Sequence, residues 1–328
     1  MATSALKTWA SARAGQATKT PAEVKSPLPK IAVEKKPERA PKAKLPPRVW
    51  HNDHAANDLP KETWHEHYDK HPDEGGKPTE ARKALVHDPI ITKAFQGKTP
   101  VAKGEQKIAI MTMGAPASGK SSGLNGIDTS KFVVVDPDSI KGKLPEYKKA
   151  TQDRNNTYKG AAAMAHEESS ALAKQITKKA IEEGHHVLID GTGANQASFL
   201  KKLKELKENG YHVHVIGSHL DVGQGLERAR VRSGSEGRHV PEEVIKEAYH
   251  SVPKNFEAIS KAADSFHFMD NRGKESKQVW SKDEDGEHAH DPHFVAQFKA
   301  AHWGETPSKA PKDQAEQLRL LKEGRKKS

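Results

Sequence analysis

The residues with the clearest chemical role lie in one short segment, Gly114-Ala-Pro-Ala-Ser-Gly-Lys-Ser121, which fits the pattern GxxxxGK[ST]. Glycines let a backbone wrap around phosphate groups without steric clashes, and free backbone N–H groups at a helix start attract anions. In such a loop the lysine reaches the β- and γ-phosphates of a nucleotide, and the hydroxyl after it ligates Mg²⁺. A glycine-rich turn followed by a surface lysine is the alternative interpretation.

We therefore expect this segment to bind ATP, with GTP as the alternative nucleotide, together with Mg²⁺. Lys120 is expected to act in catalysis, and Ser121 to ligate Mg²⁺ with a water-mediated contact to Asp138 or Asp190. The residues expected to contact the nucleotide are Gly114, Ala115, Pro116, Ala117, Ser118, Gly119, Lys120, Ser121 and Ser122.

Two apolar segments farther along the chain end in carboxylates. Residues 132–135 (FVVV) run into Asp136-Pro-Asp138, and residues 186–189 (HVLI) run into Asp190-Gly-Thr192. Open α/β sheets bind ligands at the carboxyl ends of their strands, where a carboxylate can accept the proton of an acceptor hydroxyl. Asp136 could instead cap the helix that follows it, and Asp190 could form an Asp-Gly turn.

Arginines gather in the following part of the chain, where residues 226–232 (LERARVR) precede Arg238. Residues four apart share one face of a helix, so Arg228 and Arg232 would point together while Arg230 turns away. Arginines that close over a moving phosphoryl group stabilise its negative charge. Salt bridges on the helix surface are the alternative for each arginine.

These side chains need a sheet to bring them together. Short apolar segments rich in β-branched residues fit buried parallel strands, and helical patterns lie between them. The expected strands are 107–113, 132–135, 186–190, 211–217 and 265–269, and the expected helices are 79–95, 160–183 and 195–209. Alternation of strands with helices predicts an α/β fold, a doubly wound parallel sheet of about five strands flanked by helices.

Composition limits how much of the chain folds. Only 34% of its 328 residues are hydrophobic and 30% are charged. Residues 1–50 hold eleven basic and three acidic side chains with seven prolines, which is typical of a disordered basic arm. We expect this arm to be followed by a His/Trp-rich polar linker at 51–78, a globular domain at 79–272 and a polar C-terminal extension at 273–328.

Several chemistries are excluded or disfavoured. The chain has no cysteine, so disulfides, thiolate metal sites and cysteine nucleophiles are excluded. The histidines at 51–71 and 283–293 lack a convincing ligand spacing and are expected to be solvated. No run approaches the ~18 apolar residues of a membrane span, so we expect a soluble cytoplasmic protein without membrane contact. The basic arm is a candidate for weak nucleic-acid contact.

With these residues together, the chain resembles the zeta toxin family of P-loop kinases over about residues 79 to 270. The resemblance rests on a helix before the loop (ARKALVHDPIITKAF), on VVVDPDSIKGKLPEY with Pro145 and Tyr147, and on LIDGTG, where Asp190 stands at a position that is often Glu in the family. The arginine-rich helix followed by RHVP completes it.

The resemblance implies a kinase that transfers the γ-phosphoryl group of ATP to a hydroxyl acceptor, a UDP-sugar such as UDP-N-acetylglucosamine. It makes an antitoxin protein a candidate partner, although the sequence itself does not establish one. It implies Asp138 as catalytic base and Arg238, with Arg228 or Arg232, as the residues that grip the transferred phosphate. The residues expected to bind the acceptor are Asp136, Lys141, Asp190 and Thr192.

Two other functions remain open at this point. A polynucleotide 5′-hydroxyl kinase would use the same loop, base and arginines, but it needs a basic channel, and the charge of residues 51–303 is close to neutral. The other is a nucleic-acid or partner-binding protein with a degenerate kinase domain, against which the intact Lys120, Ser121 and Asp138 argue.

Overall fold

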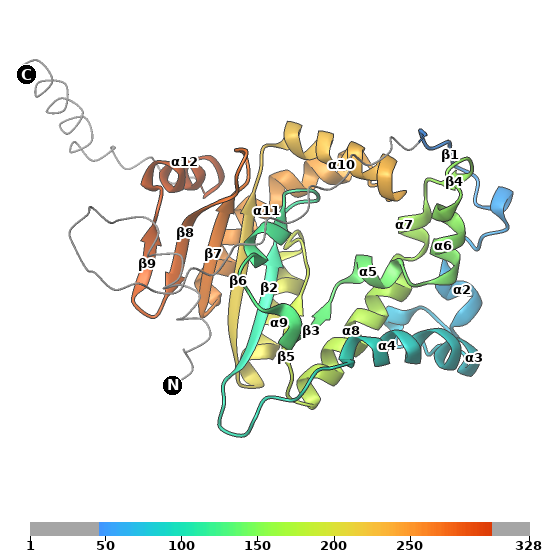
Figure 1. The fold of residues 1–328 in the computed structure, drawn as a ribbon, viewed down its shortest axis with the longest axis horizontal. Helices are drawn as coiled ribbons and strands as arrows, with labels where there is room; N and C mark the ends of the chain where they lie inside the picture. Colours follow the sequence, from blue (N-terminus) through green and yellow to red (C-terminus); the bar gives the residue numbers. More distant parts are fainter. Residues whose placement is uncertain (1–45, 304–328) are drawn as a thin grey trace, which may run out of the picture.

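A computed structural model describes residues 46–303, and a seven-stranded sheet forms its centre (Figure 1). The strands follow the order β3-β5-β2-β6-β7-β8-β9, in which the first five are parallel and the last two antiparallel. The strands are β1 Trp50–His51, β2 Lys107–Met113, β3 Phe132–Val135, β4 Thr157–Tyr158, β5 His186–Ile189, β6 Tyr211–His219, β7 Ser265–Asp270, β8 Lys277–Asp283 and β9 Gly286–Ala289. The fold class expected from the sequence is confirmed. Most of the expected arm and the end of the expected extension lie outside the described residues.

Short helical turns lie between longer helices that pack on the sheet. The short elements are η1 Ala55–Asn57, α2 Thr63–His67, η2 Pro72–Glu74, α3 Glu80–Arg82, η3 Lys83–His87, η4 Lys120–Leu124, η5 Thr129–Lys131, α5 Pro137–Lys141 and α7 Ala161–Met164. The longer helices are α4 Asp88–Phe95, α6 Pro145–Gln152, α8 His166–Glu182, α9 Gln196–Glu208, α10 Val222–Glu236, α11 Glu242–Ala262 and α12 Pro292–Trp303. None of the helices within residues 46–303 is long and apolar enough to cross a membrane.

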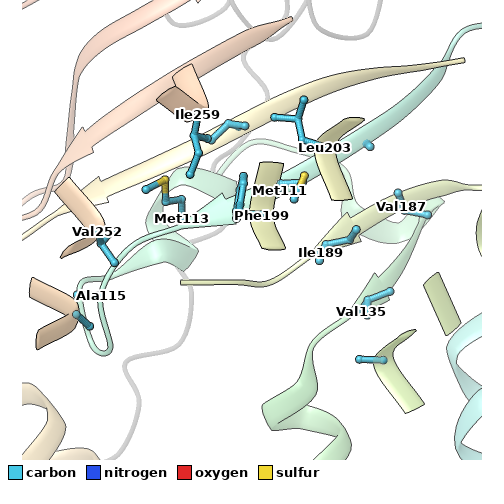
Figure 2. Packing of buried hydrophobic residues seen from close by; sticks show 14 of the residues in the cluster. Met111, Met113, Ala115, Val135, Val187, Ile189, Phe199, Leu203, Val252 and Ile259 are labelled. Atoms are coloured by element: carbon cyan, nitrogen blue, oxygen red, sulfur yellow. The ribbon is translucent and has the colours of Figure 1, made fainter. Parts of the chain in front are cut away.

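The main core lies on one face of the sheet. Figure 2 shows Met111 and Met113 of β2 near Phe199 and Leu203 of α9 and Ile259 of α11. Buried residues of α8 belong to the same cluster. Because successive strand residues point to opposite faces, this contact requires the odd-numbered residues of β2 to be apolar. Helices α8, α9 and α11 therefore cover the face to which these residues point.

The opposite face is covered more thinly. Ile108 and Ile110 of β2 contact a small cluster that includes Leu124 and Ile127. The segment after the loop supplies this cover, and it forms only the five-residue 3₁₀ helix η4. Val134 of β3 remains 44% exposed. The helix start expected after the loop is thus present, but the helix is one short turn.

The helix expected at 79–95 contains a π-helical turn. Lys83–His87 forms this wider turn, and α4 follows with Pro89 in its first turn. Proline has no backbone N–H and so leaves one carbonyl of the preceding turn without its helical donor. A π turn shifts the hydrogen bonds from i−4 to i−5 carbonyls, so the turn before Pro89 has a different bonding pattern. The helical path therefore continues across Pro89.

The segment expected as a polar linker is packed against the domain. Leu59, Thr63 and Tyr68 are buried. Arg82, at the start of the helical path, donates to Glu168 at 2.7 Å and to Glu146 at 2.8 Å. Burial alone would raise the pKa of Glu168, but hydrogen bonds from His87 and Arg82 lower it to about 2. This buried ionic cluster joins α3, which follows that segment, to α6 and α8.

The C-terminal part also differs from the expected polar extension. β8 pairs with β7, and α12 packs beside α11 and β8. Trp280, Phe294 and Phe298 are buried together with Phe268. Polar and charged residues lie between these aromatic side chains, so the apolar pattern of β8 and α12 was not recognised in the sequence. The domain extends at least to Trp303.

Candidate active site

The loop expected to bind phosphate, residues 114–121, follows β2 directly and has a strained, glycine-dependent backbone. Gly119 has φ 86° and Ala117 has φ 61°, both in the left-handed region. A Cβ on Gly114 would lie 2.2 Å from Ser218 Oγ, so only glycine fits there. Left-handed residues within such a loop turn successive N–H groups toward one centre and create an anion-binding nest.

The donors of this loop fit a phosphate chain. Within the described residues, the backbone N–H groups of Ala117, Gly119, Lys120 and Ser121 have no hydrogen-bond acceptor. The ammonium group of Lys120 and the hydroxyl of Ser121 also have no partner there. These groups could hold nucleotide phosphates, and Ser121 could hold Mg²⁺.

Other parts of the chain support the loop from behind. Asn271, which follows β7, donates from Nδ2 to the carbonyl of Ser118 at 2.6 Å and accepts from Ser122 Oγ at 3.0 Å. Ser118 Oγ lies 2.7 Å from Ser218 Oγ of β6. Ser118 and Ser122, expected as nucleotide contacts, thus use their hydroxyls to brace the loop. Asn271 and Ser218 were not found from the sequence, because a lone polar residue after a strand carries no distinctive pattern.

A chain of buried imidazoles reaches the same loop from β6 and β7. His267 Nε2 lies 2.9 Å from the carbonyl of Gly123 and must donate to it, so its Nδ1 accepts from His214 Nε2 at 2.7 Å. His214 Nδ1 then accepts from Ser265 Oγ at 2.7 Å. Burial, together with the neighbouring His267 and His212, keeps the pKa of His214 well below its usual value. The two imidazoles thus support η4 from β6 and β7.

The carboxylates expected at the strand ends meet at the edge of the sheet that carries the loop. Val135 of β3 pairs with Ile189 of β5, which pairs in turn with Met111 of β2. Asp190 accepts a hydrogen bond of 2.5 Å from Thr112 Oγ1, two residues before the loop. The carbonyl of Thr192 accepts from Gly114 N at 3.0 Å. The side chain of Asp190 is therefore bound to β2 just before the loop, rather than being only part of a turn.

Asp136 caps α5, which is the alternative to a role as proton acceptor that the sequence left open. Its Oδ1 accepts from the backbone N–H of Asp138 at 2.9 Å and of Ser139 at 3.2 Å. Burial raises the pKa of Asp136, and the carboxylates of Asp190 and Asp138 raise it further. The three carboxylates therefore lie close enough to influence one another.

Asp138 projects from the first turn of α5 and faces two cations. Its Oδ2 accepts from Arg238 Nη2, and its Oδ1 lies 3.4 Å from Lys141 Nζ. Lys141 is 8% exposed and also lies 3.4 Å from His166 Nδ1. The expected base and an expected acceptor contact are thus in direct contact.

The arginines divide between the loop and Asp138. Arg228 donates to the carbonyl of Asn271 at 3.1 Å, and a Cβ on Gly119 would lie 3.5 Å from its Nη1. Arg232 pairs with Glu236. Burial opposes a raised pKa of Arg232, but the hydrogen bond to Glu236 and the charge of Asp138 raise it. Arg228 thus lies beside the loop, and Arg232 and Arg238 near Asp138.

The exposed Arg230 pairs with Glu227, away from these groups. The helical spacing in the sequence correctly separated it from its neighbours.

This mostly parallel sheet, with a phosphate-binding loop after its central strand β2, defines the class of P-loop kinase-type proteins. The chain belongs to the zeta toxin family, whose sequence model matches residues 91–284. The family resemblance seen in the sequence is confirmed.

Solved structures of AvrRxo1-ORF1:ORF2, of low sequence identity, share this fold. The AvrRxo1-ORF1:ORF2 complex is 16% identical, with 76% of this chain and 84% of that chain covered and a TM-score of 0.60. The structure of AvrRxo1-ORF1:ORF2 with ATP is 15% identical, covers 71% and 75%, and has a TM-score of 0.57. The PezAT toxin–antitoxin system of Streptococcus pneumoniae is 17% identical, covers 60% and 79%, and has a TM-score of 0.47. None of the curated proteins matches the chain.

Proposed function

We propose that this protein transfers the γ-phosphoryl group of ATP to a hydroxyl of a small acceptor, with a UDP-sugar such as UDP-N-acetylglucosamine as the candidate. The observation that carries the proposal is the position of Asp138, which lies at the edge of the sheet that carries the loop and is flanked by Arg238 and Lys141. A base, a phosphate-binding arginine and a nucleotide loop are the parts that phosphoryl transfer needs.

In the proposed reaction, Lys120 and the free N–H groups of the loop hold the phosphates of ATP. The bond between the γ-phosphorus and the oxygen bridging to the β-phosphate breaks, and a bond to the acceptor oxygen forms. Asp138 takes the proton of the acceptor hydroxyl, and ADP leaves. Arg238 and Arg232 stabilise the charge on the moving group. Mg²⁺, held by Ser121 and through water by Asp138 or Asp190, would neutralise phosphate charge.

The acceptor side favours a small molecule over a nucleic acid. Asp136, Asp138 and Asp190 lie together there, whereas a nucleic-acid strand needs a basic channel that neutralises many phosphates. Asp136, Lys141, Asp190 and Thr192 are the proposed acceptor contacts, and the UDP-sugar itself comes from the family resemblance. An antitoxin partner is part of the same proposal, supported by the AvrRxo1-ORF1:ORF2 structures, which are complexes of two components.

The test incubates the purified protein with γ-labelled ATP and Mg²⁺, separately with UDP-N-acetylglucosamine and with a 5′-hydroxyl oligonucleotide. We expect label on the sugar nucleotide, and at least ~10²-fold slower labelling when Lys120→Ala replaces the wild type. Label on the oligonucleotide alone would overturn the small-acceptor proposal. Binding of ATP without transfer to either acceptor would favour the degenerate binding protein.

A further inference from the structure

The helix that carries the arginines, α10, is weakened by glycines. It contains Gly223, Gly225 and Gly234, and only Gly225 is buried. Each glycine in a helix interior costs about 1 kcal/mol of helix stability relative to alanine. The helix stops at Gly237, which has φ 76°, and Arg238 follows at once. The place of Arg238 therefore depends on what fixes this helix end.

Two arginines from other parts of the chain bind that end. Arg48 Nε and Arg154 Nη2 each donate to the carbonyl of Gly234 at 3.1 Å. Both guanidinium groups also reach the carbonyl of Ser235 at 3.4 Å. Carbonyls in the last turn of a helix lack intrahelical donors and carry partial negative charge, so cations stabilise them.

Arg48 also binds α6 and β4, which follow Asp138 and α5 in the chain. Its Nη1 donates to the carbonyl of Thr151, in the last turn of α6, at 2.7 Å and to Thr157 Oγ1 of β4 at 3.1 Å. One guanidinium group thus connects the end of α10 with α6 and β4.

The backbone around Arg48 is itself fixed, and we call residues 46–51 the strap. β1, which forms its end, pairs in parallel with β4. Val49 N donates to the carbonyl of Arg154 at 2.8 Å, and Arg154 Nε donates to the carbonyl of Pro46 at 3.0 Å. Arg48 therefore projects from an anchored backbone.

The strap also contacts the residues on both sides of Arg238. A Cβ on Gly237 would lie 2.9 Å from Arg48 Cζ, so the guanidinium group packs directly against this glycine. The rings of Trp50 and His239 lie 5.7 Å apart. The short segment that carries Arg238 thus rests on the strap at both of its neighbours.

We propose that Arg48 is a positioning residue, which holds the end of α10 against α6 so that Arg238 meets Asp138. The role in catalysis rests on the function proposed above. Arg48 lies before residues 91–284, so the strap is outside the part of the chain that the family model matches. Four acceptors in different directions suit the fork of an arginine, whereas a lysine presents a single charge.

The test compares the full-length wild type with Arg48→Ala and Arg48→Lys. The control is Arg230→Ala, because Arg230 lies on the same helix but is exposed and pairs with Glu227. In ligand-free protein we expect Arg48→Ala to raise amide hydrogen exchange in residues 234–241 at least ~10-fold, with little change in β2 and β5. The control should exchange as the wild type does, and Arg48→Lys should lie between the two.

Activity gives a second readout, with either the labelled sugar nucleotide or ATP hydrolysis as the reaction. We expect kcat of Arg48→Ala to fall at least ~10-fold while KM for ATP changes less than ~3-fold, because small misplacements of catalytic groups mainly cost rate. If Arg48 acts through Arg238, the double variant Arg48→Ala/Arg238→Ala will be no slower than Arg238→Ala alone.

The two proposals fail in distinguishable ways. Unchanged exchange in residues 234–241 would overturn the positioning role, whether or not the protein is active. Faster exchange throughout the sheet, with additive losses in the double variant, would also overturn it and indicate a general folding defect. A wild type that binds ATP but transfers nothing would contradict the proposed function, while hydrogen exchange still decides the role of the strap. If Arg48→Ala does not fold, Arg154→Ala gives the same regional test.

Discussion

Arg238 pairs with Asp138, so the arginine proposed to hold the transferred phosphate neutralises the proposed base in this structure. The other carboxylate oxygen of Asp138 faces Lys141 Nζ at 3.4 Å. ATP would offer Arg238 a competing anion. We expect nucleotide binding to draw Arg238 away and to leave one oxygen of Asp138 free for the proton of the acceptor.

Replacement of the base should separate chemistry from binding. Asp138→Asn keeps the shape of the side chain but removes its basicity, so turnover should fall at least ~10²-fold. Affinity for ATP, measured by calorimetry, should stay within a few-fold of the wild type. The exposed Asp128, changed to Asn, is the control. Unchanged turnover in Asp138→Asn would move the role to Asp136 or Asp190.

Arg238 and Arg230 give a matched pair of arginine variants. Arg238→Ala removes a cation from the moving phosphate, and we expect turnover to fall by about 10²-fold or more. Arg230→Ala removes an exposed guanidinium bound to Glu227 and should keep wild-type turnover. Equal losses in steady-state assays of the two variants would contradict the division of arginines described here.

Lys120 is the cation of the loop, and the described residues offer its ammonium group no partner. Lys120→Ala should weaken ATP binding about 10-fold and lower turnover at least ~10²-fold, because the lysine contacts the β- and γ-phosphates. Equilibrium binding of a fluorescent ATP analogue measures the first effect. The exposed Lys103, changed to Ala, should bind as the wild type does.

Asn271 supports the loop without facing its donors. Asn271→Ala leaves the carbonyl of Ser118 without the donor seen here, and a lost buried hydrogen bond costs about 1–3 kcal/mol. We expect a lower free energy of unfolding in urea and a higher KM for ATP. The exposed Asn155, changed to Ala, is the control. A variant with lowered stability but unchanged KM would show that the loop keeps its shape without this amide.

The buried histidines predict loss of stability in acid. His214 must stay neutral in the folded state, whereas its unfolded pKa is about 6.5. Its contribution to stability is therefore complete above pH 6.5 and is lost as the pH falls below that value. By pH 5 the loss should reach about 2 kcal/mol from this residue. His214→Gln cannot titrate, so its free energy of unfolding should change less between pH 7 and 5. The exposed His293, changed to Gln, should keep the slope of the wild type.

The sequence predicted the strands and helix ends that depend on neighbouring residues alone. β2 and β3 have the bounds expected from their apolar residues, and α9 ends before Gly210 as expected. The loop was predictable because a backbone that wraps around phosphate groups requires glycine, lysine and serine at a fixed spacing. These elements depend little on residues far away in the chain.

The missed contacts join residues far apart in the sequence. Asn271 binds a carbonyl 153 positions earlier, and Arg48 binds one 186 positions later. Their acceptors are backbone carbonyls, which every residue possesses, so no residue type marks the partner. The exposed fraction of a lone arginine or asparagine likewise cannot be derived before the sheet order is known.

The bond from Gly114 N to the carbonyl of Thr192 joins the nucleotide loop to the segment that follows Asp190. Thr112 makes a second link, since its hydroxyl donates to Asp190 from the strand that becomes the loop. A ligand that changes the conformation of the loop must therefore also affect the segment at residues 190–192, and the reverse holds as well. By thermodynamic linkage, if ATP tightens binding of the acceptor by some factor, the acceptor tightens binding of ATP by the same factor. The two substrates would then bind cooperatively, although no atom of one needs to touch the other.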